Sequence, residues 1–380
     1  MVKRQEARGE GSRQEANAPC PAPLSILERF IVHKGRRDEA LFPGLTRALN
    51  GDLLVSFCTQ FDCQPGGAAF LLRSSDEGWT WNAPVPLVRS KKPDGCINLS
   101  VGLTTLKDGT VLYPCCDTRI TRKWDQHEAD LIILRSQDHG ATWSDPVPIR
   151  TGMLEPFAYG KIIELRNGDL LCPIWGKRVP AEAWRTGLVR SRDGGHTWGS
   201  HVTIGYDSNM RLPSPQVEVV HCAGFNEATL VELPDGRILA VLRQQGVGPD
   251  VRQMFQSFSP DGGLTWSEPY PMFLWGTSPS LHLTASGLLL LGYRNHKGNP
   301  QGLATPGVGI SLSKDVGATW TEHRLLEDPQ GYQYQHEFEA GYPAFHDLDR
   351  HQTLIVFYSY DPALDAPRYL AANLLNLAGC

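Results

Sequence analysis

Two apolar runs joined by a polar turn that contains glycine recur along this chain at regular intervals. Alternating apolar and polar residues indicate half-buried strands, and Asn-Gly or Asp-Gly between them indicates a tight hairpin. The pattern is found in LTRALNGDLLVSF (45–57), LTTLKDGTVLYP (103–114), IIELRNGDLLCP (162–173), LVELPDGRILAV (230–241) and LHLTASGLLLLGY (281–293). A degenerate sixth copy, FHDLDRHQTLIVFY (345–358), has His351 in place of the glycine. The pattern predicts six β-hairpins.

A second motif, S-x-D-x-G-x-T-W, follows each of the first five hairpins. We call it the box; its copies are SSDEGWTW (74–81), SQDHGATW (136–143), SRDGGHTW (191–198), SPDGGLTW (259–266) and SKDVGATW (313–320). Each box aspartate lies 25–29 residues after the hairpin glycine. Ser and Asp side chains accept hydrogen bonds from the N–H groups of tight turns, and glycine permits a positive φ. Five copies in register indicate five structural turns rather than five active sites.

The two motifs together define one repeating unit of about 51–68 residues. Hairpin, connection, strand, box and final strand make four antiparallel strands, which is typical of one propeller blade. Six hairpins predict an all-β, six-bladed β-propeller over residues 25–380. The sixth blade has predicted strands at 343–350, 353–360 and 367–375 but no box, so we expect LERFIVHK (27–34) to supply its fourth strand and close the ring.

Composition narrows the possible partners and location. The net charge of −5 indicates neither a nucleic-acid nor a membrane-surface partner, and the most apolar run, 287–293, is too short to span a bilayer. Residues 1–24 are polar without a signal-peptide-like segment, so we expect a disordered tail and a cytoplasmic protein. The nine cysteines lack metal-binding spacing and are interpreted as free buried thiols. We expect no metal and no cofactor, and no feature indicates an oligomeric state.

The repeated boxes in a six-bladed pattern resemble the sialidase (neuraminidase) superfamily, in which this motif is called the Asp-box. The resemblance covers residues 25–380. It implies a ligand site at the mouth of the propeller, on the face opposite the hairpins and boxes, and a glycan or oligosaccharide as ligand. At this mouth we expect the beginnings of the first strands, including Tyr159 and Lys161 in blade 3 and Ser280 and His282 in blade 5.

The resemblance also implies catalytic residues. Glu227 and Arg243, in FNEATLVELPDGRILAVLR (225–243), match a sialidase glutamate followed sixteen positions later by a substrate-binding arginine. Tyr342 in AGYPAFHDL matches the sialidase nucleophile, for which the glutamate is the base. A neutral phenol suits a sugar with a carboxylate at its anomeric carbon, because that carboxylate repels an anionic nucleophile. Asp62 is the candidate for the group that protonates the leaving oxygen or activates water.

The sequence departs from the family in the three arginines that bind the substrate carboxylate. Leu41-Phe42-Pro43 stands where the family has Arg-Ile-Pro, and the segment 301–313, where the third arginine is expected, contains neither Arg nor Lys. Arg243 alone is retained. Other candidate substrate-binding residues at the mouth are Arg294, Arg119, Lys177, His296 and Trp175.

Three functions are compatible with these residues. The first is a sialidase-like glycoside hydrolase that acts on a terminal acidic or modified sugar through Tyr342, Glu227 and Asp62. The second is a polysaccharide lyase that acts on uronates, with Tyr342, His282, His296 and Arg243 as the reacting groups. The third is a non-catalytic glycan-binding propeller in which Trp175, Tyr159 and Tyr360 are stacking surfaces.

Overall fold

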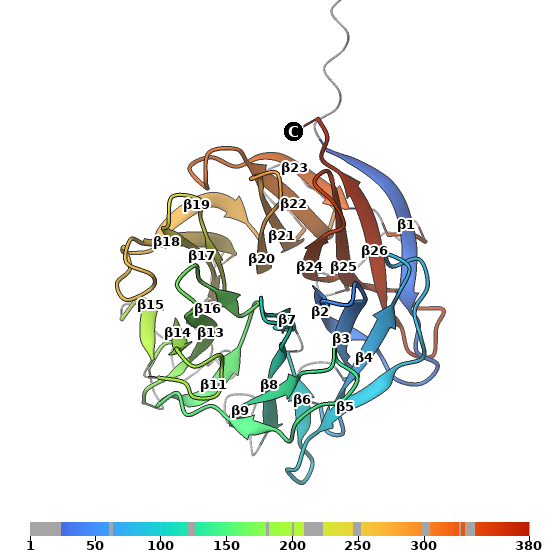
Figure 1. Ribbon diagram of the computed structural model, residues 1–380, viewed down its shortest axis with the longest axis horizontal. Coiled ribbons are helices and arrows are strands. Elements are labelled where there is room, and N and C mark those ends of the chain that lie inside the picture. The colour runs from blue at the N-terminus through green and yellow to red at the C-terminus, as the bar shows by residue number, and fades with distance from the viewer. Residues whose placement is uncertain are drawn as a thin grey trace, which may run out of the picture.

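The computed structural model shows six four-stranded antiparallel blades arranged in a ring around a central axis (Figure 1). It describes residues 24–60, 64–99, 101–120, 127–179, 182–199, 201–208, 223–245, 252–297, 305–326, 328–330 and 339–379. The predicted all-β, six-bladed propeller is confirmed. No helix in these ranges is long and apolar enough to cross a membrane.

The first three blades follow one another along the chain, each from its inner to its outer strand. Blade 1 consists of β2 (Leu41–Arg47), β3 (Leu53–Cys58), β4 (Ala68–Ser74) and β5 (Val85–Arg89). Blade 2 has a divided inner strand and consists of β6 (Cys96–Asn98), β7 (Thr104–Thr105), β8 (Val111–Ile120), β9 (His127–Ser136) and β10 (Val147–Pro148). Blade 3 is divided in the same way and consists of β11 (Leu154–Ala158), β12 (Ile163–Glu164), β13 (Leu170–Lys177), β14 (Arg185–Ser191) and β15 (Val202–Gly205).

The last three blades complete the ring, and the sixth takes one strand from the other end of the chain. Blade 4 consists of β16 (Gly224–Glu232), β17 (Ile238–Gln245), β18 (Gln253–Ser259) and β19 (Tyr270–Trp275). Blade 5 consists of β20 (Thr277–Leu283), β21 (Leu289–Asn295), β22 (Gly307–Ser313) and β23 (Thr321–Leu326). Blade 6 consists of β24 (Gly341–Asp347), β25 (Gln352–Tyr360), β26 (Arg368–Asn376) and β1 (Ser25–His33).

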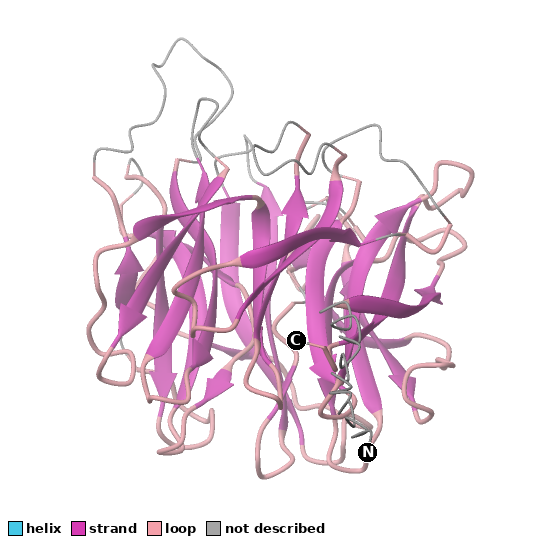
Figure 2. Ribbon diagram, turned by 90° about the horizontal axis from the view of Figure 1, so that it is seen from above, coloured by secondary structure: helices cyan, strands magenta, loops and turns pink. Residues whose placement is uncertain are grey.

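The ring closes as the sequence predicted. The N-terminal strand β1 pairs antiparallel with β26, from Ser25 opposite Asn376 to His33 opposite Leu370, and lies outside it in Figure 1. Leu24, the last residue of the predicted tail, is buried against blades 5 and 6, whereas residues 1–23 lie outside the described ranges. In the view of Figure 2, the strands run between two opposite faces of the ring, where the loops lie.

Each box forms the turn between the third and fourth strands of its blade. In the second box, the Ser136 hydroxyl donates to Asp138 at 2.7 Å and accepts from the Gly140 amide at 2.8 Å. Thr142 donates to Asp138 through both its amide and its hydroxyl. These hydrogen bonds hold the pKa of Asp138 far below its ordinary value, with the Thr142 hydroxyl contributing most. The other four boxes repeat the arrangement.

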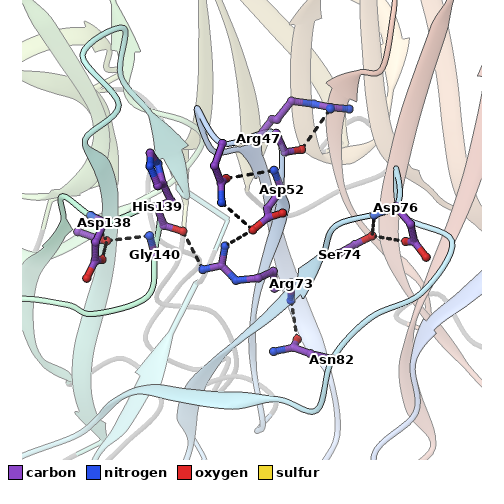
Figure 3. Close-up of polar contacts among 12 residues, drawn as sticks. Arg47, Asp52, Arg73, Ser74, Asp76, Asn82, Asp138, His139 and Gly140 are labelled. Carbon is purple, nitrogen blue, oxygen red and sulfur yellow. Dashed lines mark hydrogen bonds and ion pairs between the residues drawn. The ribbon is translucent and has the colours of Figure 1, made fainter.

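The boxes also join neighbouring blades. Arg73 on β4 donates to the His139 carbonyl oxygen in the second box at 2.8 Å, and to Asp52 of its own hairpin at 2.6 Å (Figure 3). Arg135 and Arg190 contact the third and fourth boxes through the carbonyls of Gly194 and Gly262. Gln256 does the same for the fifth box, at 3.2 Å from the Gly317 carbonyl. A side chain from the third strand of blades 1 to 4 therefore caps the box of the next blade.

We expect Arg190→Met to lower the free energy of unfolding by about 2 kcal/mol, because it removes charge-assisted hydrogen bonds that are largely shielded from water. Arg190 donates to Asp169 at 2.6 Å and to the Gly262 carbonyl, and its side chain is 10% exposed. Arg192 is a matched control, since it lies 3.9 Å from the same Asp169 but is 73% exposed. We expect Arg192→Met to change stability by no more than about 0.5 kcal/mol. Equal denaturant midpoints for the two variants would contradict this role.

We expect His139→Gly to stabilise the protein by about 1 kcal/mol, because a left-handed backbone costs a non-glycine residue about 1–2 kcal/mol. His139 has a φ of 62°, and the same position is glycine in the third and fourth boxes, with φ 67° at Gly194 and 73° at Gly262. In the reverse change, Gly194→Ala, the added Cβ has no neighbouring atom within 4 Å. Any loss of stability then comes from the left-handed backbone alone, so this variant should be less stable. Thermal unfolding measures both variants; a lower melting temperature for His139→Gly would rule out strain at this turn.

Candidate functional site

A bulge at the start of the inner strand recurs in five blades. Between the first and second strands the register slips by one residue, for example from Leu41 opposite Cys58 to Gly44 opposite Ser56. The residue inside each bulge has a positive φ, and these residues are Phe42, Glu155, Glu227, Ser278 and Tyr342, with φ from 42° to 54°. Non-glycine residues rarely adopt this conformation, and such strain concentrates at functional sites. The bulges therefore identify a candidate site at the mouth.

Four of the five bulge residues contact one another, although they come from blades 1, 4, 5 and 6. The Tyr342 hydroxyl donates to Glu227 Oε1 at 2.8 Å, and the Ser278 amide donates to Glu227 Oε2 at 3.1 Å. The Phe42 ring packs edge-on against the Tyr342 ring, with centroids 4.6 Å apart. Residues far apart in the sequence thus form one buried cluster around a single carboxylate.

The Glu227 carboxylate is held by three donors. Besides Tyr342 and Ser278, Arg243 Nη1 lies 2.8 Å from Oε1, and Glu227 as a whole is 3% exposed. Burial alone would lower the pKa of Arg243, but the charge and hydrogen bond of Glu227, together with the neighbouring Tyr342 and Tyr159, raise the pKa above its ordinary value. Arg243 is therefore a permanent cation, and its charge compensates the buried carboxylate.

Arg294 lies on the other side of the Tyr342 ring. Its guanidinium carbon is 5.2 Å from the Tyr342 ring centroid and 5.6 Å from that of Tyr358. Its Nε donates to the Ala340 carbonyl at 2.9 Å, and its Nη2 donates to the Tyr358 hydroxyl. Arg294 therefore places a positive charge beside the Tyr342 ring, which favours negative charge on that phenol.

Tyr159 is a second phenol in this cluster, with its ring centroid 5.9 Å from that of Tyr342. Its hydroxyl donates to the Pro279 carbonyl at 3.1 Å. Burial, and then the neighbouring Glu227 charge, raise its pKa well above the ordinary value, so it remains a neutral phenol. Only 2% of Tyr159 is exposed, which leaves no open ring face for stacking a sugar.

The other predicted site residues have different surroundings. Asp62 lies outside the described residues. Arg119, on β8, forms an ion pair with Glu128 at 2.6 Å, and Trp175 stacks on Phe157 with centroids 4.4 Å apart. Lys177 lies 3.8 Å from Glu155 and 4.3 Å from the Trp184 ring centroid. The structure therefore brings Tyr342, Glu227, Arg243 and Arg294 together, while Arg119, Lys177 and Trp175 belong to blades 2 and 3.

His296 is buried beside the arginines rather than open to the mouth. Its Nε2 is 2.8 Å from the Thr277 hydroxyl. Burial is the main cause that lowers its pKa to about 2, followed by the charge of Arg294. His296 is therefore a neutral side chain throughout the neutral pH range.

Lys161 and His282, which were expected at the mouth, line a cavity of about 200 Å³ together with Tyr159 and residues of β16, β20 and β24. Lys161 Nζ donates to the Phe345 carbonyl at 2.8 Å, and burial lowers its pKa to about 8. His282 binds Asp347 at 2.8 Å. Both side chains therefore bind residues of β24 in blade 6, because the inner strand positions that reach the mouth lie earlier in each blade.

The sequence analysis missed Glu155 and Ser278. It placed Tyr159 and Ser280 at the mouth of blades 3 and 5, a few residues too far along the chain. The sequence does contain a signal for these positions, because a proline directly follows the bulge residue in four blades. The pairs are Phe42-Pro43, Glu155-Pro156, Ser278-Pro279 and Tyr342-Pro343. Proline has no N–H group to donate to the neighbouring strand, so it is tolerated at a bulge, where regular strand pairing is interrupted.

The comparisons with known proteins agree with this architecture. The family model described as BNR repeat-like domain matches residues 125–350. A sialidase from Bacteroides fragilis is 26% identical over 348 residues, which cover 78% of this chain and 57% of the sialidase, so the match spans little more than half of that relative.

Solved structures show the same fold. A protein of unknown function from Dyadobacter fermentans has a TM-score of 0.74 at 22% identity, covering 93% of this chain and 99% of that one. The Hadza microbial sialidase has a TM-score of 0.68 at 18% identity, covering 91% of this chain and 68% of that one. At 18–22% identity, these structures show that the chain shares their fold.

We expect the unfolding free energy to fall with decreasing pH, in part through His296. The unfolded ring takes up a proton below about 6.5, whereas the folded ring, with a pKa of about 2, does not. The unfolded state then binds more protons, so His296 contributes a loss of about 1 kcal/mol per pH unit between pH 6 and 5. His296→Gln keeps a polar partner for Thr277 and should flatten this slope in urea unfolding at pH 7, 6 and 5. The exposed-residue variant His351→Gln is the control, and identical slopes in all three proteins would contradict the prediction.

Proposed function

Since the chain belongs to the BNR repeat-like domain family, we propose that it is a sialidase-like glycoside hydrolase with Tyr342 as nucleophile and Glu227 as its base. The observation that carries the proposal is the 2.8 Å hydrogen bond from the buried Tyr342 hydroxyl to the Glu227 carboxylate. The Bacteroides fragilis relative that bears the name sialidase supports the same reaction class.

The geometry supports each chemical role. Tyr342 attacks the anomeric carbon while its phenolic proton passes to Glu227 Oε1, which already accepts that hydrogen bond. Arg243 neutralises Glu227 before the transfer, and Arg294 stabilises the oxygen of Tyr342 as it gains charge. The hydrolysis of a glycosyl–tyrosine intermediate by water completes the reaction.

The proposed substrate is a glycan with a terminal acidic or otherwise modified sugar. Leu41 and Phe42 are both fully buried where the family has its first arginine, and Phe42 presents an aromatic edge to Tyr342. Recognition of a carboxylate then rests on Arg243 and Arg294 rather than on three guanidinium groups. The site therefore favours a sugar whose acidic group needs fewer bidentate contacts than that of sialic acid.

The test is turnover of a fluorogenic sialoside beside aryl uronides and neutral aryl glycosides. We expect Glu227→Gln to lower kcat by about 10²–10⁴-fold, and Tyr342→Phe to lower it at least as much, because they remove the base and the nucleophile. Tyr113→Phe makes the same phenol-to-phenyl change in the core of blade 2 and serves as the control.

The outcomes separate the alternatives. Activity that persists in Tyr342→Phe would exclude the proposed nucleophile. An unsaturated, ultraviolet-absorbing product from uronate polymers would indicate a lyase. Binding of glycans without any turnover, weakened but not abolished by Tyr342→Phe, would indicate a binding module.

A further inference from the structure

A second pocket, of about 440 Å³, lies in blade 3 and contains none of the residues around Glu227. Three segments form it: the connection from β10 to β11, the end of β13, and the end of the third box with the residues that lead into β15. The side chains that line it include Arg150, Arg178, His201 and Trp198. Sites for small molecules occupy about 300–1,000 Å³, so this pocket has room for a sugar as well as an anionic group.

Positive charge lines this pocket. Arg150 and Arg178 are both exposed, and none of the described lining residues is acidic. Neither guanidinium has an ion-pair partner within the described ranges. Glu182, which accepts a hydrogen bond from the Arg178 amide, is already paired with Arg185 at 3.1 Å. The two guanidinium groups of the pocket therefore lack a counter-charge from the part of the chain that the structure describes.

His201 adds a buried polar group to the two arginines. Both of its ring nitrogens are shielded from solvent, and neither has a hydrogen-bond partner among the described residues. The ring lies against β14 at Gly187, where a Cβ would clash with Nε2. Burial, and then the charges of Arg178 and Arg185, lower the pKa of His201 to about 4, so the ring is neutral at pH 7. A buried N–H without a partner is explained by a ligand that accepts its hydrogen bond.

The three donors indicate the chemistry of that ligand. Arg150 precedes β11, Arg178 follows β13 and His201 precedes β15, so the donors belong to three separate segments. A phosphate or sulfate ester has three terminal oxygens that accept hydrogen bonds, one for each donor, whereas a carboxylate has two. Guanidinium groups suit such oxyanions because of their planar fork of N–H donors. The partly buried Trp198 ring adds an aromatic surface against which the carbon atoms of a sugar can pack.

We propose that this pocket is a second glycan site, which binds a sugar through a sulfate or phosphate ester. The ester oxygens accept hydrogen bonds from Arg150, Arg178 and His201, and the sugar ring lies against Trp198. The inference goes beyond the proposed hydrolase function, because it uses no residue of the cluster around Glu227 and concerns binding alone.

The experiment measures the binding of N-acetylglucosamine 6-sulfate and 6-phosphate by calorimetry, beside unmodified N-acetylglucosamine, inorganic sulfate and inorganic phosphate. We expect the two sugar esters to bind at least about tenfold more tightly than the inorganic ions, and the uncharged sugar to show no measurable binding. Arg178→Gln and Arg150→Gln should each weaken ester binding by about 10–100-fold, because each removes charge-assisted hydrogen bonds. Arg192→Gln makes the same change on the same blade, at a side chain that is 73% exposed, and should leave binding unchanged.

Nuclear magnetic resonance of the histidine rings locates the bound ester. An anion beside the imidazole favours its charged form, so N-acetylglucosamine 6-sulfate should raise the pKa of His201 from about 4 by about one to three pH units. The signals of His351, which is exposed at the hairpin of blade 6, should not respond to the ester and serve as the control.

Every other outcome contradicts the inference. The absence of ester binding would exclude the site. Equal ester binding by the unmodified protein and both arginine variants, or no response of His201, would place the ester elsewhere on the protein. Inorganic ions that bind as tightly as the esters would show an anion site without recognition of a sugar. Because no turnover is measured, none of these results bears on Tyr342, and inactivity toward every glycoside would leave this site intact.

Discussion

The capping of the second to fifth boxes by a side chain from the preceding blade is the interaction on which the ring depends. A blade buries its faces only against its neighbours, so the angle between blades must repeat around the axis. Arg73, Arg135 and Arg190 donate to the carbonyl of the residue that directly follows the box aspartate. At the fourth junction Gln256 donates to the carbonyl one residue further on, that of Gly317. Because this contact uses the box backbone, the turn geometry is constrained more strongly than the side chains exposed around it.

The bulges show where the ring departs from regular sheet. A regular inner strand would pair fully and direct alternate side chains into the walls between blades. The extra residue re-aims one side chain per blade toward the axis at the cost of a strained backbone. Glu227 and three other such residues meet in one cluster, and no single blade could have assembled them.

Electrostatic compensation then makes the cluster possible. An isolated carboxylate at the burial of Glu227 would be costly, and Arg243, Tyr342 and the Ser278 amide all donate to it. Removing one donor leaves the buried Glu227 carboxylate less well compensated, which destabilises the folded protein. The stability of each variant at this site must therefore be measured beside its activity. Arg294 donates to the Ala340 carbonyl and the Tyr358 hydroxyl, and its guanidinium lies beside the rings of Tyr342 and Tyr358.

The sequence by itself determined the number of blades, the position of each hairpin and box, and the closure by residues near the N-terminus. These features depend on local turn chemistry and on strand periodicity, which short segments encode. The family resemblance also named Glu227, Arg243 and Tyr342 from their spacing.

Only the tertiary structure decided which side chains share the mouth. Counting back from a hairpin places Tyr159 and Lys161 at the start of blade 3, but an interrupted inner strand moves its bulge four residues earlier, to Glu155. It also buried His296 and Tyr159 instead of leaving them open to a ligand. The register slips and the burial of these side chains arise from the packing of whole blades around one axis, which short segments of sequence do not encode.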